Sequence, residues 1–145
     1  MNDALEAPAT VAPRRHLLLF SYFWPPLGGA GVQRALKLAQ AAPEFGWRVS
    51  VVAAKARPAD AQDPSLLTDD VAAIPAERVD HARVGGRLWR LRSWMPPDPY
   101  ALWRRPALAA AHKIAARDRP DAVMSTSMPY TAHLAAQPFA AELGV

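Results

Sequence analysis

The chain of 145 residues contains no cysteine, and this absence removes two kinds of site. Without thiols, neither disulfide bonds nor thiolate metal sites can form. Histidine is scarce as well: only four are present, and none forms a His-x-x-x-His or similar pair of the kind that holds a metal ion. We therefore expect no metal or other cofactor to be bound by these residues.

Long apolar stretches are also missing. No run of about 18 apolar residues occurs, so the sequence predicts no transmembrane helix. The stretch 1–15 lacks the basic start and apolar centre of a signal peptide, and it carries acidic residues and prolines. We predict that 1–15 is a disordered leader, that 16–145 is the folded domain, and that the protein is cytoplasmic.

Acidic residues are in the minority. The chain has 13 Asp and Glu against 17 Lys and Arg, which gives a formal net charge of +4. This balance favours anionic partners such as lipid head groups, nucleotide diphosphates or nucleic acid, without choosing among them. Apolar residues make up 51% of the chain, as in globular proteins, and the length suits one domain with a real core.

The chain does contain a regular alternation of strand and helix patterns. Strands are predicted over 17–22, 47–53, 78–84 and 122–124, and helices over 32–45, 66–74, 101–118 and 130–143. Because parallel strands need crossover helices, this order predicts an α/β fold with a parallel, three-layer, Rossmann-like sheet. The mixed third strand favours an edge, and the short fourth strand a buried position. Pro43 and Pro138 should disturb the helices that contain them.

The stretch 16–34 organises the chain. Its apolar start is followed by a loop rich in proline and glycine and then by a helix pattern that opens at Val32. The free N–H groups of that helix end would suit an anion such as a phosphate, but a plain tight turn explains the glycines equally well. The loop does not match a dinucleotide-binding fingerprint, because Arg34 occupies the position of its third glycine, and it does not match a P-loop, because the required lysine does not follow. An NAD-binding domain is also disfavoured, because the end of the second strand, 53–55, contains no acidic residue.

Three phrases in order resemble a known family. They are Pro-Pro-Leu-Gly-Gly-Ala-Gly-Val-Gln-Arg at 25–34, Gly-Trp-Arg-Val-Ser-Val-Val at 46–52, and Pro-Asp-Ala-Val-Met-Ser-Thr-Ser-Met-Pro at 120–129. Together they resemble the N-terminal domain of the glycosyl transferase family 4-like proteins over most of 17–144. The resemblance implies the N-terminal half of a GT-B architecture, in which two Rossmann-like domains face each other across a cleft.

The resemblance also implies a reaction. This half would bind the acceptor (a glycan, a lipid-linked sugar or a small molecule), and a C-terminal domain with a Glu-x(7)-Glu motif would bind the nucleotide-sugar donor. The chain stops at Val145, before that domain, so we expect the 145 residues to be incomplete at the C-terminus and to show little transfer alone. The alternative is a non-enzymatic α/β binding module or remnant.

The resemblance and the positions of the loops together predict the site residues. The substrate-binding candidates are Gly28, Gly29, Gly31, Arg34, Ser125, Ser127 and Tyr130. The hydroxyls that follow the fourth strand could bind a sugar, or they could cap the last helix. His133, one turn into that helix, could accept a proton from an acceptor hydroxyl, the alternative being a structural histidine.

Arginine and tryptophan alternate between Arg83 and Arg105. Basic residues interact favourably with anionic lipids, and tryptophan prefers the level of the head groups. This stretch is therefore a candidate for binding an anionic membrane surface at the inner face of the membrane. The alternative is a solvated loop whose tryptophans pack under neighbouring helices. No nucleic-acid motif is present, and we expect no nucleic-acid partner.

Overall fold

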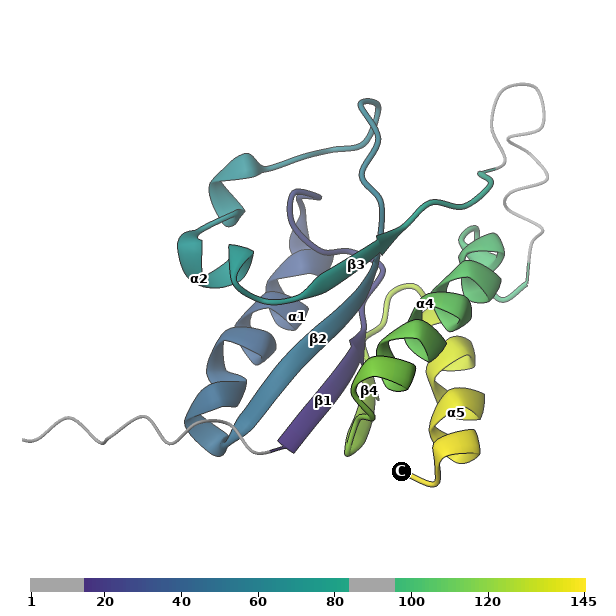
Figure 1. Cartoon of the computed structure of the whole chain (residues 1–145). Helices are drawn as coiled ribbons and strands as arrows, with labels where there is room; N and C mark the ends of the chain where they lie inside the picture. The colour runs from purple at the N-terminus through teal and green to yellow at the C-terminus, as the bar shows by residue number, and fades with distance from the viewer. Residues whose placement is uncertain (1–14, 84–95) are drawn as a thin grey trace, which may run out of the picture.

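A computed structural model of the chain describes residues 15–83 and 96–145. Its centre is one sheet of four parallel strands in the order β3-β2-β1-β4 (Figure 1). The strands are β1 (Arg15–Phe20), β2 (Trp47–Ala54), β3 (Ala76–Val79) and β4 (Ala122–Ser125). The predicted α/β class and parallel Rossmann-like sheet are thereby confirmed. Of the predicted leader, 1–14 lies outside the described residues, and Arg15 begins β1.

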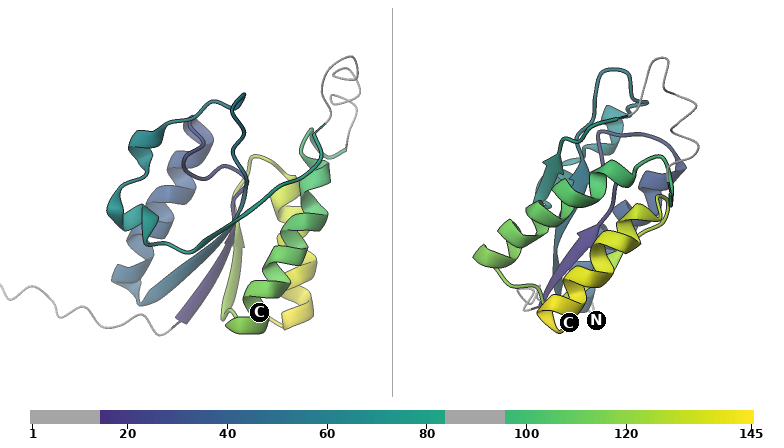
Figure 2. Two further views of the ribbon diagram at one scale, coloured as in Figure 1. Left: turned by 45° about the horizontal axis from the view of Figure 1, so that its top comes forward. Right: turned by 90° about the vertical axis from the view of Figure 1, so that its right-hand side faces the viewer.

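In the part of the chain that the structure describes, three longer helices cover the sheet. They are α1 (Ala30–Ala41), α4 (Arg104–Arg117) and α5 (Thr131–Leu143). Shorter helical turns are α2 (Asp69–Ala72) and the 3-10 turns Ala42–Phe45, Pro64–Leu66 and Ala101–Trp103. Helix α1 lies on one face of the sheet, and α4 and α5 lie on the other, as the two views of Figure 2 show. Among the described residues, no helix has the length and apolar character needed to cross a bilayer.

Both faces of β1 are buried, which explains its uninterrupted apolar run. Successive side chains of a strand point to opposite faces. Leu18 and Phe20 pack in the cluster beneath α4 and α5, whereas Leu19 packs in the cluster beneath α1. All three have 0% of their surface exposed. With both faces of the sheet packed in the core, polar groups lie mainly at the two ends of the strands.

The ends of the helices largely follow the sequence signals. Helix α1 stops at Ala41, just before Pro43, and Gly46 closes the following 3-10 turn with a φ of 78°. Gly144 ends α5 in the same left-handed conformation, with a φ of 70°. Only glycine adopts this conformation without a steric cost from Cβ. Pro138, expected to disturb the last helix, lies inside a continuous α5.

Further expectations about the elements are wrong, among them the third strand, which runs over Ala76–Val79 and not over 78–84. The fourth strand is not buried: β4 forms an edge of the sheet, and Met124 is 40% exposed. A short apolar pattern cannot distinguish a central strand from an edge, because the order of strands is set by contacts far apart in sequence. The predicted helix over 66–74 is instead the 3-10 turn that ends at Leu66 followed by α2. β3 does lie at the other edge, as predicted.

Candidate binding site

The order of the strands reverses between β1 and β4. From β1 the chain adds β2 and β3 on one side, and it then returns to place β4 on the other side. Helix α1, which follows β1, and α5, which follows β4, lie on opposite faces of the sheet (Figure 2). In open parallel sheets, ligands bind outside the carboxyl ends of the strands at such a reversal.

The loops that leave β1 and β4 lie side by side at this edge. The backbone N–H of Thr126 donates to the carbonyl of Phe20 (3.1 Å). The Nη1 of Arg34, one turn into α1, donates to the carbonyl of Ser127 (3.1 Å). The loop 125–129 is therefore bonded to the end of β1 and to the first turns of α1, the two elements that flank the glycine-rich loop 23–31.

The glycine loop owes its shape to contacts with its own chain. Gly29, the N-cap of α1, has a φ of 98°, which favours glycine. A Cβ on Gly28 would lie 3.2 Å from Cβ of Asp63, and a Cβ on Gly31 would lie 3.1 Å from Cδ2 of Phe23. The tight-turn explanation thus accounts for much of the glycine content, and of the three glycines only Gly28 lines the cavity described next.

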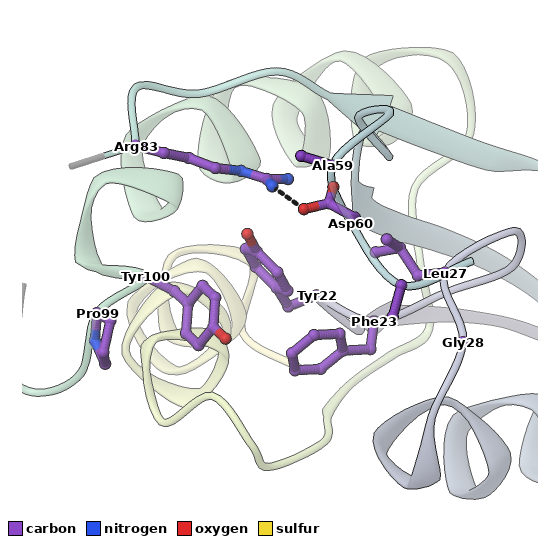
Figure 3. A pocket seen from close by; sticks show the side chains of 10 residues that line it. Tyr22, Phe23, Leu27, Gly28, Ala59, Asp60, Arg83, Pro99 and Tyr100 are labelled. Carbon is purple, nitrogen blue, oxygen red and sulfur yellow. Dashed lines mark hydrogen bonds and ion pairs between the residues drawn. The ribbon is translucent and has the colours of Figure 1, made fainter. Parts of the chain in front are cut away.

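A cavity of about 280 Å³ opens at this edge of the sheet. Its walls come from the segments that follow β1, β2 and β3 and from the segment that leads into α4 (Figure 3). The lining residues are Tyr22, Phe23, Leu27, Gly28, Ala59, Asp60, Ala61, Arg83, Pro99 and Tyr100. Side chains from distant parts of the sequence therefore form one concave surface.

One wall of the cavity carries an ion pair. Arg83 donates through Nη1 to Oδ1 of Asp60, and through Nη2 to the carbonyl of Lys55 (3.1 Å). The backbone N–H of Arg57 donates to Oδ2 of Asp60 (2.7 Å). Burial alone would raise the pKa of the Asp60 carboxyl, but the hydrogen bonds from Arg83 and Arg57 outweigh it and hold that pKa below its usual value. Asp60 is therefore a carboxylate at neutral pH, and its charge is matched by that of Arg83.

The opposite wall is aromatic. The ring of Tyr100 lies 4.4 Å from that of Tyr22 and 5.7 Å from that of Phe23, measured between centroids. The Tyr22 hydroxyl lies 3.2 Å from Nε2 of His81, which is buried beneath it. Burial, followed by the charges of Arg83 and Arg57, lowers the pKa of His81 from 6.5 to about 4. His81 is thus neutral at pH 7, and the cavity has little net charge.

The remaining predicted residues lie away from this cavity. Oγ of Ser125 is 2.7 Å from Nδ1 of His133, and both line a separate hollow of about 250 Å³ beside β4 and α5. Ser127 meets Arg34 through its carbonyl, not through its hydroxyl. Tyr130 is 56% exposed. The structure thus pairs Ser125 with His133 and Ser127 with Arg34, but it brings none of these four residues or Tyr130 into the cavity.

The hydroxyls after β4 do not cap α5, so that part of the sequence interpretation is wrong. The backbone N–H of Thr131 and its Oγ1 both donate to the carboxylate of Asp98, at 2.8 Å and 2.7 Å. Asp98 is 6% exposed and also accepts from the backbone N–H of Tyr100 (2.9 Å). A carboxylate from 33 residues earlier in the chain therefore fixes the start of the last helix.

Sequence reasoning did not single out Asp60, Asp98, Tyr22 or Tyr100, and it treated Arg83 only as part of a basic stretch. One signal was available. Tyr22 ends the first predicted strand, Asp60 follows the second, and Arg83 is the last residue but one of the third, so all three fall near the carboxyl edge where ligands bind. Trp103, in contrast, is 0% exposed in the core, as the packing explanation of the tryptophans expected; Trp89 and Trp94 lie outside the described residues.

No protein-family model, curated protein or solved structure matches this chain. Within 15–83 and 96–145, no group of three or more His, Asp or Glu side chains is placed to hold a metal ion. The function must therefore be argued from the fold and from the chemistry of the cavity.

Proposed function

We propose that this domain is the acceptor-binding half of a GT-B glycosyltransferase, an enzyme that moves a sugar from a nucleotide-sugar donor to an acceptor hydroxyl. The cavity at the carboxyl edge of the sheet holds the acceptor. The observation that carries this proposal is the Asp60–Arg83 pair facing the rings of Tyr22, Phe23 and Tyr100 across that cavity. The resemblance of 25–34, 46–52 and 120–129 to the family supports the same assignment.

The chemistry of the two walls suits a neutral sugar. Aromatic rings pack against the apolar C–H face of a pyranose, while the Asp60 carboxylate accepts, and the Arg83 guanidinium donates, hydrogen bonds to its hydroxyls. Pockets for drug-sized ligands span about 300–1,000 Å³, so a cavity of about 280 Å³ suits a single ring.

The same chemistry argues against a diphosphate in this cavity. A dianionic group needs net positive charge, and Asp60 neutralises Arg83. Arg34 is held on the carbonyl of Ser127 at the reversal of the strands, outside the cavity. We therefore assign the cavity to the acceptor and leave the donor to a second domain. His133, the predicted proton acceptor, lies with Ser125 in the separate hollow beside β4 and α5, so we assign it no role toward a sugar bound in this cavity.

Binding of sugars to the 145-residue chain tests this proposal. Methyl glycosides of glucose, galactose and mannose, N-acetylglucosamine, UDP and GDP are titrated and followed by saturation-transfer NMR. We expect at least one neutral sugar to bind with saturation, and Asp60→Asn to weaken that binding at least tenfold. Asp69→Asn is the matched control, because Asp69 is exposed and lies outside the cavity.

Two results would overturn the proposal. One is binding of UDP or GDP that depends on Asp60 while no sugar binds. The other is equal sugar binding by Asp60→Asn and Asp69→Asn. In the gene product that contains these residues, Asp60→Asn should raise KM for the acceptor and leave KM for the nucleotide-sugar unchanged.

A further inference from the structure

Helix α4 carries cations and no acidic residue. From Arg104 to Arg117 it contains four permanent positive charges, and all four side chains are exposed. They are Arg104, Arg105, Lys113 and Arg117. Within 15–83 and 96–145 no ion pair or hydrogen bond engages these side chains, whereas Arg48, Arg57 and Arg83 each pair with an aspartate. Glu142 of α5 lies 3.7 Å from His112, and Asp118, which follows the helix, pairs with Arg48.

An exposed apolar side chain lies at the start of this helix. Leu102 is 43% exposed, and with Ala101, Arg104, Arg105 and Leu108 it lines a hollow of about 520 Å³. The next residue, Trp103, is buried in the core and is not available at the surface. At a spacing of 100° per residue, Arg105, Ala109 and Lys113 share the side of α4 opposite its buried residues Ala107, Ala110 and Ala111, and Leu102, in the 3-10 turn before α4, lines the hollow together with Arg105. We call this side, together with Leu102, the outer face of α4.

We propose that the outer face of α4 docks on an anionic lipid surface, with Leu102 entering the head-group region and Arg105 and Lys113 held against the lipid charges. Each basic side chain near such a surface contributes about 1 kcal/mol, and an exposed apolar residue adds affinity that salt does not screen. A single-stranded nucleic acid would need aromatic rings on which its bases could stack, and the outer face presents none. The observations therefore favour a lipid surface.

The position of this face bears on the cavity. Pro99 and Tyr100 line the cavity, and Ala101 and Leu102 follow them directly in the chain. Docking through Leu102 would therefore hold the cavity close to the head groups. The docking itself does not depend on what the cavity binds, so it can hold or fail independently of the proposed acceptor site.

Flotation of the 145-residue chain with vesicles tests the docking. Vesicles of pure phosphatidylcholine are compared with vesicles that contain 30% phosphatidylglycerol. We expect binding only to the second kind, and at least tenfold weaker binding for the double variant Arg105→Glu/Lys113→Glu. The control Arg15→Glu/Lys37→Glu makes the same change of net charge at exposed positions on other elements and should bind within twofold of the natural chain.

Leu102→Ser separates a lipid surface from other polyanions. We expect it to weaken vesicle binding at least threefold, with the effect persisting in 0.5 M NaCl, and to leave binding of a labelled poly(dT) oligonucleotide unchanged. The docking is refuted if both charge-reversal variants bind vesicles equally, if Leu102→Ser binds like the natural chain, or if poly(dT) binds more tightly than the anionic vesicles. Circular dichroism of each variant verifies that it is folded.

Discussion

The amino and carboxyl ends of the sheet carry similar residue types, but these residues lie in different surroundings. At the amino end, His16 is fully buried, with Nε2 2.9 Å from Oγ of Ser50, and its backbone N–H donates to Asp121 (2.7 Å). Arg48 donates to Asp118 beside it (2.6 Å). At the carboxyl end, the Asp60–Arg83 pair instead lines a cavity. The amino end thus holds a buried histidine that is hydrogen-bonded to neighbouring segments, whereas the carboxyl end holds an ion pair in the wall of the cavity.

The first prediction tests this contrast at Asp98, which lies at the carboxyl end of the sheet but contributes to the stability of the fold. Asp98→Ala removes the acceptor of three hydrogen bonds, among them the one from the buried backbone N–H of Thr131. We expect a loss of about 4 kcal/mol in the free energy of unfolding, measured by urea denaturation. Asp63→Ala, which removes an exposed cap of a 3-10 turn, should cost about 1 kcal/mol. Equal losses of unfolding free energy in the two variants would show that Asp98 does not stabilise the start of α5.

The second prediction concerns pH and the buried His81. Above pH 6.5 His81 is neutral in the folded and the unfolded chain. Between pH 6.5 and about 4 the unfolded chain binds a proton that the folded chain does not, so stability falls as the pH falls, and below about 4 the loss stays constant. At about 1.4 kcal/mol per pKa unit the full loss is about 3 kcal/mol. His81→Gln should flatten the stability profile over this range; an unchanged slope would show that other groups cause it.

The third prediction tests the glycine loop. Gly29 has a φ of 98° and a ψ of 174°, a conformation that is almost closed to other residues. Gly29→Ala should therefore cost about 2 kcal/mol in thermal or urea unfolding, even though a Cβ there meets no atom within 4 Å. Gly144→Ala, at the end of α5, is the comparison and should cost about 1 kcal/mol. If Gly29→Ala proves harmless, the loop does not hold this conformation.

The smallest effect is expected at the amino end and sharpens the contrast between the two ends. Ser50→Ala leaves Nε2 of His16 without its hydrogen-bond partner and should cost about 1 kcal/mol. It should leave sugar binding within twofold, whereas Asp60→Asn weakens binding. A loss of sugar binding in Ser50→Ala with the fold intact would mean that the two ends are coupled.

Local patterns predicted most of the fold. The apolar run of β1, the β-branched β2 and the stops at Pro43 and Gly46 are signals carried by neighbouring residues, and all appear where expected. The edge position of β4 was missed, because strand order depends on how distant segments pack. Whether a strand is central or at an edge leaves little trace in four residues.

The candidate site was predicted less well. The two loops chosen from the sequence leave β1 and β4 at the carboxyl edge of the sheet, where the cavity also opens, but of the eight predicted site residues only Gly28 lines that cavity. Asp60 and Arg83 meet across 23 residues, and Asp98 and Thr131 across 33. Such pairs form only after the loops are placed by the fold, so spacing in the sequence does not reveal them.

The exposed outer side of β4 has a practical consequence for solution work. Among the described residues no strand pairs with the outer edge of β4, and Met124, which is 40% exposed, lines a hollow together with Phe45 and Trp47. Open strand edges of this kind pair with one another as a protein is concentrated. Affinities should therefore be measured on dilute samples, because chains consumed by self-association would otherwise be counted as available for ligand.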